Sequence, residues 1–226
     1  MKRKTWLVIS ASVVILSMLL TGCGNLFGTS FDAAKYVKGN IDSIYLGVFS
    51  KEFMDIVVDT EAELKEQHEL GLQAEAEFFM HYFDIADDAL TDDMRKEIIE
   101  MYRQIYTHSR YEVGEATKSG DTYLVSVTIY PMDIMSRIVE EDVEPFMDLW
   151  IARDGAGEFD NMSIEDIERV WARDIIDLVK ARINSIGYLD PQTISVQVNL
   201  NKSNGQEVWI IDDHDFSRID AYIIAY

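Results

Sequence analysis

The sequence predicts an α+β fold: N-terminal helices, then a four-stranded antiparallel sheet packed on helices, with a helical excursion between two β-hairpins. Two observations predict it. Apolar residues recur every three or four positions across residues 31–107, which is the period of a core-facing helix. Apolar and polar residues then alternate with period two across 123–130 and 194–200, and each of these segments adjoins a short turn.

The segment 31–107 is expected to contain successive capped helices. Ser50 and Thr91 are expected N-caps, and Asp92 and Asp93 fall in a first turn, where the helix dipole favours anions. The first expected apolar stripe is Ala33, Val37, Ile41, Ile44 and Val48. The buried face after Thr91 is expected to be Met94, Ile98, Met101, Tyr102 and Ile105.

Two β-hairpins are expected after residue 107. The first joins 111–117 to 123–130, where Pro131 ends the strand, and the second joins 194–200 to 208–211 through a turn that contains Asn204 and Gly205. Between them, 133–150 is expected to be helical with an interruption near Pro145, and Ser163 caps another helix. The stripe of that helix is Ile164, Ile167, Trp171, Ile175, Leu178, Val179 and Ile183. Residues 216–226 close the fold as a helix or a final strand.

The first 22 residues have the pattern of a secretory signal peptide. Lys2, Arg3 and Lys4 form a basic start, and residues 6–20 carry no charge. A helix of that length spans roughly 22 Å at about 1.5 Å per residue, which is short of a bilayer core of roughly 30 Å. A permanent transmembrane anchor is therefore the weaker interpretation.

The stretch Leu20-Thr21-Gly22-Cys23 resembles the lipobox of bacterial lipoproteins, and Cys23 is the only cysteine. The resemblance implies cleavage before Cys23, a diacylglyceryl group on its thiol and often an acylated amino terminus. Two or more chains would anchor the protein stably, whereas one chain holds only marginally. An ordinary secretory signal is the alternative. The expected organisation is a signal peptide at 1–22, a lipidated cysteine and tether at 23–30, and an extracytoplasmic domain at 31–226, divided into 31–107 and 108–226.

The composition constrains the partners. The chain has 20 basic and 41 acidic residues; removal of Lys2, Arg3 and Lys4 leaves 17 against 41, a formal charge of −24. A domain with this negative charge repels nucleic acid and anionic lipid head groups, so no nucleic-acid partner is expected. The lipid on Cys23 is expected to hold the protein at the membrane. Capture of cations or cationic peptides is a second explanation for the acidity, beside simple solubility.

Asp212, Asp213, His214 and Asp215 form the densest group of candidate metal ligands. On an extended strand, adjacent side chains point to opposite faces, so at most two of them would converge. A solvated turn after the last strand is the preferred interpretation, and no cofactor is expected. His68 falls on an apolar stripe, which favours a buried histidine with satisfied hydrogen bonds.

The order of elements across residues 91–226 resembles the cystatin-like cone folds of the nuclear-transport-factor-2 type, which recur in uncharacterised lipoproteins of Gram-positive bacteria. The long helical excursion departs from that compact cone. Some enzymes with such folds use a tyrosine and an aspartate inside the cone, and Tyr111, Tyr123 and Tyr130 could supply a hydroxyl. No motif fixes a position, so no catalytic residue is assigned.

The sequence therefore predicts a membrane-anchored extracytoplasmic lipoprotein that acts as a binding or protein-interaction domain, without catalysis. Its target would be a small ligand, a peptide or an envelope protein. The alternatives are an enzyme with a cavity in the cone and a metal-dependent envelope sensor. Trp150 could form a ligand platform, but a core or rim anchor is the preferred interpretation.

Overall fold

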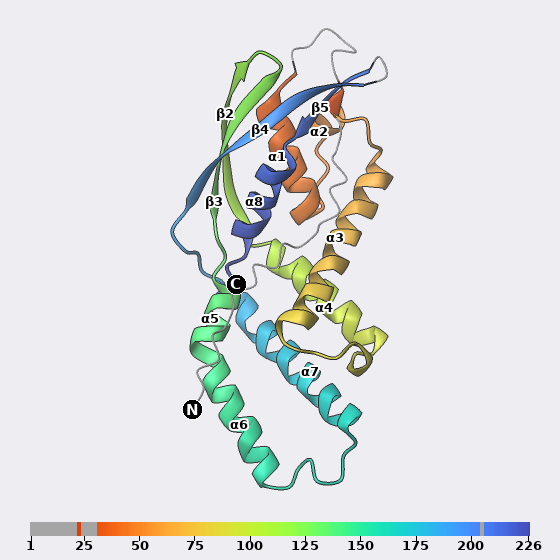
Figure 1. The fold of residues 1–226 in the computed structure, drawn as a ribbon, viewed down its shortest axis with the longest axis vertical. Helices are drawn as coiled ribbons and strands as arrows, with labels where there is room; N and C mark the ends of the chain where they lie inside the picture. The colour runs from red at the N-terminus through yellow and green to blue at the C-terminus, as the bar shows by residue number, and fades with distance from the viewer. Residues whose placement is uncertain (1–21, 24–30, 204–205) are drawn as a thin grey trace.

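The computed structural model describes residues 22–23, 31–203 and 206–226, and its strands form one antiparallel sheet at one end of an elongated molecule (Figure 1). The strand order is β1-β5-β4-β3-β2. The strands are β1 (Gly22–Cys23), β2 (Arg110–Ser119), β3 (Thr122–Tyr130), β4 (Gln192–Ser203) and β5 (Gln206–Ile211). The prediction of an α+β fold with two hairpins is confirmed, and the Asn204–Gly205 turn lies outside the described residues.

The sheet has one strand more than the sequence predicts. In β1, Gly22 pairs with Trp209 and Cys23 pairs with Val208, so this two-residue strand lies beside β5 at the edge of the sheet. Two residues are too few to carry a period-two signal, which is why the pattern gives no indication of β1.

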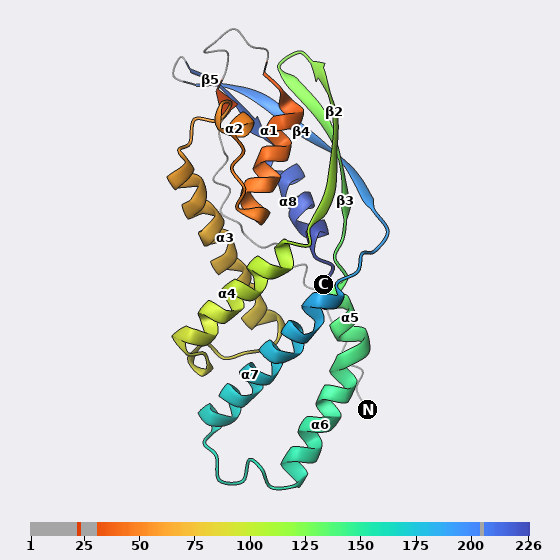
Figure 2. The same cartoon turned by 180° about the vertical axis from the view of Figure 1, so that it is seen from behind.

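Helices α1 (Ala33–Ile41) and α8 (Asp213–Ile223) cover one face of the sheet (Figures 1 and 2). Val125, Val127 and Ile129 are fully buried on that face, whereas Leu124 and Ser126 point to the other face and are exposed. The C-terminal segment, expected as a helix or a final strand, is the helix α8. After α8, Ile224 forms an isolated bridge with Met132.

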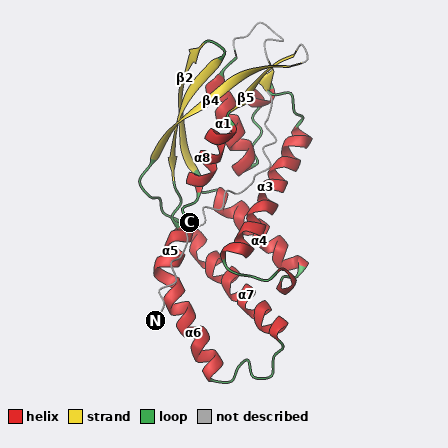
Figure 3. Cartoon of the chain, in the orientation of Figure 1, coloured by secondary structure: helices red, strands yellow, loops and turns green. Residues whose placement is uncertain are grey.

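A second group of helices follows α1 in the chain. These elements are the π-turn η1 (Asp42–Leu46), α2 (Lys51–Met54), α3 (Glu61–Tyr82), the short 3₁₀ turn η2 (Asp87–Ala89) and α4 (Asp92–Tyr106). Helix α2 lies beside α1 near the sheet, and α3 and α4 extend away from it (Figures 1 and 3). Ser50 and Thr91 cap α2 and α4 as predicted, each accepting a hydrogen bond from the backbone N–H three residues on. The predicted face of α4 is buried throughout.

The helical excursion between the hairpins forms an arm at the opposite end of the long axis from the sheet (Figure 1). It consists of α5 (Ile134–Arg137), the π-turn η3 (Ile138–Asp142), α6 (Val143–Gly155), α7 (Ile164–Arg182) and the 3₁₀ turn η4 (Ile183–Ser185). Pro145 is the third residue of α6, which follows η3 directly. The predicted interruption is therefore the π-turn that precedes α6.

Two expected core residues are exposed. Ile164, predicted on the buried stripe of α7, is 77% exposed, and Val48, predicted on the first stripe, is 49% exposed. Ile164 is the first residue of α7, at the far end of the arm, where the body offers no surface to cover it. Val48 follows Gly47, whose left-handed backbone (φ 61°) ends the π-turn, so the helical period stops before Val48.

Among the residues that the structure describes, no helix has both the length and the apolar character needed to cross a bilayer.

Candidate functional site

The predicted metal-ligand group lies at the start of α8 and not in an extended strand. Asp212 is the N-cap of α8, and its Oδ1 accepts hydrogen bonds from the backbone N–H groups of His214 (3.1 Å) and Asp215 (3.3 Å). Ligand atoms of Asp212, His214 and Asp215 lie within 4.8 Å of one another, but Asp213 is not part of this group. The expectations of a solvated turn and of at most two converging side chains are therefore wrong, because the chain turns into a helix immediately after β5.

Asp215 has a structural partner for each of its carboxylate oxygens. The residue is only 6% exposed; its Oδ2 accepts the backbone N–H of Gln197 on β4 at 2.9 Å, and Oδ1 lies 3.4 Å from the Arg218 guanidinium. Asp212 likewise satisfies the free N–H groups of a helix start. The Asp215 carboxylate thus joins α8 to β4, and the Asp212 carboxylate caps α8; these roles account for their positions without a metal ion.

The three tyrosines proposed from the sequence do not converge. The hydroxyl of Tyr111 donates to Asp42, and that of Tyr130 donates to the exposed Glu112 at 2.9 Å. Tyr123 packs its ring against Trp209, with ring centroids 4.9 Å apart. Each hydroxyl or ring therefore has a separate local partner.

A different set of tyrosines surrounds a buried carboxyl that the sequence analysis missed. Glu75 on α3 is 5% exposed, and its carboxylate accepts hydrogen bonds from the hydroxyls of Tyr106 and, at 3.4 Å, Tyr226. The hydroxyls of Tyr226 and Tyr102 lie 3.2 Å apart. Glu75 has a detectable signal, because it lies three residues after Leu72 and four before Phe79 on the apolar stripe of α3.

The carboxyls of Glu75 and Asp220 both have raised pKa values. Burial raises the pKa of Glu75 to about 7, and the negative charge of Asp220 adds to this, while the Tyr106 and Tyr226 hydrogen bonds oppose it. Burial likewise raises the pKa of Asp220 to about 6, against a hydrogen bond donated by Tyr45 at 3.1 Å. The arrangement can hold a proton near neutral pH. Because Glu75 is enclosed by packed side chains, we interpret the group as a polar core.

His68 confirms the expectation of a satisfied core histidine. It is 6% exposed, its Nδ1 lies 2.7 Å from the carbonyl oxygen of Ile44, and its Nε2 lies 3.2 Å from the guanidinium of Arg103. The carbonyl can only accept and the guanidinium can only donate, so the ring carries its proton on Nδ1. His68 thereby joins α3 to η1 and α4.

An aromatic cluster packs between α6 and α7 in the arm. Trp150 stacks on Phe159 (centroids 4.9 Å apart) and meets Trp171 edge-on at 5.2 Å, and Phe146 packs against Trp171 at 5.2 Å. Trp171 also donates from Nε1 to the carbonyl oxygen of Phe83 (3.1 Å), which ties the arm to the body. Trp150 is therefore an anchor of the arm, as preferred from the sequence.

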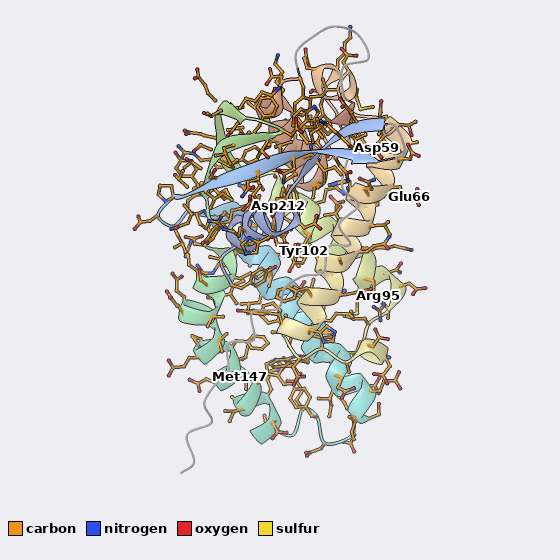
Figure 4. All side chains as sticks on the ribbon, turned by 45° about the horizontal axis from the view of Figure 1, so that its top comes forward. Asp59, Glu66, Arg95, Tyr102, Met147 and Asp212 are labelled. Carbon is orange, nitrogen blue, oxygen red and sulfur yellow. The ribbon has the colours of Figure 1, made fainter. Side chains whose placement is uncertain are left out.

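The outer side of α6 is apolar and exposed. No residue of α6 is buried. Val139 on η3 and Val143, Met147 and Ile151 on α6, four residues apart, are 49%, 37%, 41% and 66% exposed. These four residues are called the apolar row below. Met147 lies on α6 at the end of the molecule remote from the sheet (Figure 4). Exposed aliphatic residues that gather on one helix face are typical of an interaction surface.

Comparison with known proteins gives a fold and no family. No protein-family model and no curated protein matches the chain. Among solved structures, the chain is similar to a "putative lipoprotein (ycdA)" from Bacillus subtilis, with a TM-score of 0.56, 15% sequence identity and 86% of this chain covered. The match spans 56% of that protein's chain, so the present chain corresponds to little more than half of it. At this identity the similarity establishes the α+β fold.

Proposed function

We propose that the chain is a lipid-anchored extracytoplasmic protein whose domain presents a protein-binding arm away from the membrane. Cys23, at the end of the lipobox-like stretch, carries the lipid. The apolar row supports the binding part of the proposal. Its aliphatic side chains are exposed to solvent, and a bound partner would remove this apolar surface from water, which is favourable.

The geometry of the two ends supports this proposal. Cys23 pairs with Val208 of β5, beside the sheet, while α6 and the loop to α7 lie at the other end of the long axis (Figure 1). An anchor at Cys23 therefore places the sheet next to the membrane and extends the arm outward. The structural similarity to a "putative lipoprotein (ycdA)" agrees with attachment through a lipid.

Fractionation of cells that express the full-length chain tests the anchor. We expect the wild-type protein in the membrane fraction and expect Cys23→Ala to be released or left as an uncleaved precursor. Protease added to intact cells (to protoplasts where a wall intervenes) should digest the wild-type domain, since it lies outside the cytoplasmic membrane. Processed Cys23→Ala protein that stays fully in the membrane fraction would contradict the proposal.

A further inference from the structure

A row of carboxylates runs along η3 and α6 beside the apolar row. Glu140, Glu144 and Asp148 are each one residue after a member of the apolar row, so they lie about 100° around the helix from it. All three are exposed, and none forms an ion pair with a residue that the structure describes. These three residues are called the acidic row.

The cations of the arm are already paired elsewhere. Arg153 bonds to Glu158 and Asp174, and its guanidinium lies over the Trp150 ring at 5.1 Å. Arg182 holds Asp142 through two hydrogen bonds of 2.7 and 2.5 Å. Across the arm, residues 134–185, the sequence carries thirteen acidic and six basic residues, and each of the six basic residues forms an ion pair with a carboxylate outside the acidic row. The acidic row therefore has no compensating charge from the arm itself.

Two other occupants of the apolar row conflict with this charge. A second copy would place one acidic row against another, on a chain that already carries a formal charge of −21. A bilayer with anionic head groups would repel the acidic row, and the arm lies at the opposite end of the molecule from Cys23. A partner with an aliphatic stripe would cover the apolar row, and positive charge beside that stripe would face the acidic row.

We propose that the outer face of α6 binds a basic amphipathic helix of another envelope protein. This inference rests on the proposed function and names the chemistry of its partner. The apolar row from Val139 to Ile151 extends about 18 Å at about 1.5 Å per residue, which matches three turns of a partner helix. The partner's aliphatic residues cover the apolar row while its Lys or Arg residues, three or four apart, reach the acidic row.

The test uses synthetic helical peptides as probes of the full-length chain in mild detergent. The first probe is an 18-residue amphipathic peptide of Leu and Lys, the second has Glu in place of Lys, and the third has the composition of the first in scrambled order. Fluorescence anisotropy of a labelled peptide measures each Kd at low and at raised salt. We expect the Leu/Lys peptide to bind and to weaken as salt rises, and expect at least about tenfold weaker binding for the other two.

Two pairs of variants locate the binding. Met147→Ser with Ile151→Ser removes half of the apolar row, and its control is Leu70→Ser with Leu124→Ser, which are 43% and 41% exposed elsewhere. Far-ultraviolet circular dichroism verifies that all variants remain folded. We expect about tenfold weaker binding of the Leu/Lys peptide for the first pair and no change for the control.

A charge-matched comparison separates the acidic row from the overall negative charge. Glu144→Gln with Asp148→Asn and Glu66→Gln with Glu77→Gln each remove two exposed carboxylates, the latter from α3 (Figure 4 labels Glu66). We expect the first pair to weaken binding and to reduce its salt dependence, while the second leaves both nearly unchanged.

Equal binding by both pairs would overturn the proposal, because attraction would then come from net charge alone. Absence of Leu/Lys peptide binding would also overturn it, as would concentration-dependent self-association through Met147 or partition of the arm into vesicles of phosphatidylcholine and phosphatidylglycerol. The fractionation of Cys23→Ala is independent of these measurements. A failed anchor therefore overturns the proposed function, and failed peptide binding with an intact anchor overturns only this inference.

Discussion

Replacing Glu75 with glutamine should flatten the dependence of stability on pH. Burial raises the pKa of the Glu75 carboxyl from its ordinary 4.5 to about 7, so the folded chain binds this proton more tightly than the unfolded chain does. The contribution to the free energy of unfolding is fully present below pH 4.5 and is lost as pH rises through about 7. Between pH 5 and pH 8 that loss is about 2.5 kcal/mol.

The variant Glu75→Gln has no charge to bury at any of these pH values. Its amide oxygen can accept from Tyr106, and its NH₂ can donate to Tyr226, so the hydrogen bonds of the protonated acid are retained. At pH 5 the two proteins should therefore have similar stability. At pH 8 the variant should be more stable than the wild type by up to about 2.5 kcal/mol.

Urea unfolding followed by tryptophan fluorescence, at pH 5, 6, 7 and 8, measures this difference. Glu77→Gln is the matched control, because Glu77 lies two residues along α3 and is exposed. We expect the control to follow the wild type at every pH. A wild type and a Glu75→Gln variant whose unfolding free energies change in parallel from pH 5 to pH 8 would refute the reasoning.

The remaining predictions concern packing. Gly39→Ala should destabilise by about 1–3 kcal/mol although alanine is the better helix former, because the added Cβ would lie 2.1 Å from the Phe53 ring. Gly71→Ala, with no neighbouring atom within 4 Å, should stabilise by roughly 0.5–1 kcal/mol. Trp171→Phe should cost about 1–2 kcal/mol by removing the donor to the Phe83 carbonyl. Urea midpoints measure all three, and reversed signs for the two glycine variants would contradict the packing account.

The regular elements could be predicted from the sequence because local chemistry determines them. Ser50, Thr91 and Ser163 each cap a helix as predicted, since a hydroxyl satisfies a free N–H without help from the rest of the chain. The alternation of 123–130 and 194–200 predicts both central strands, because one face of the sheet is buried.

The site features depend on distant contacts and were harder to predict. Asp212 caps α8 because the chain turns from β5 into a helix, and the group of four acidic and histidine residues does not reveal that turn. Glu75 and Asp220 come from α3 and α8, and their hydroxyl partners are spread from residue 45 to residue 226. The exposure of the apolar row could not be read from its spacing either. A four-residue period is typical of a buried face, and only the tertiary structure shows that this row stays exposed among the described residues.

Photo-crosslinking in intact cells tests the central claim, that the outer face of α6 meets a partner in the envelope. A photoreactive phenylalanine analogue placed at Met147 is compared with the same group at Leu124, since both positions are 41% exposed. We expect a crosslink from Met147 to a basic, helical segment of another envelope protein, lost when Glu144 and Asp148 are neutralised, and none from Leu124. Identical products from both positions, or none from Met147, would contradict the account.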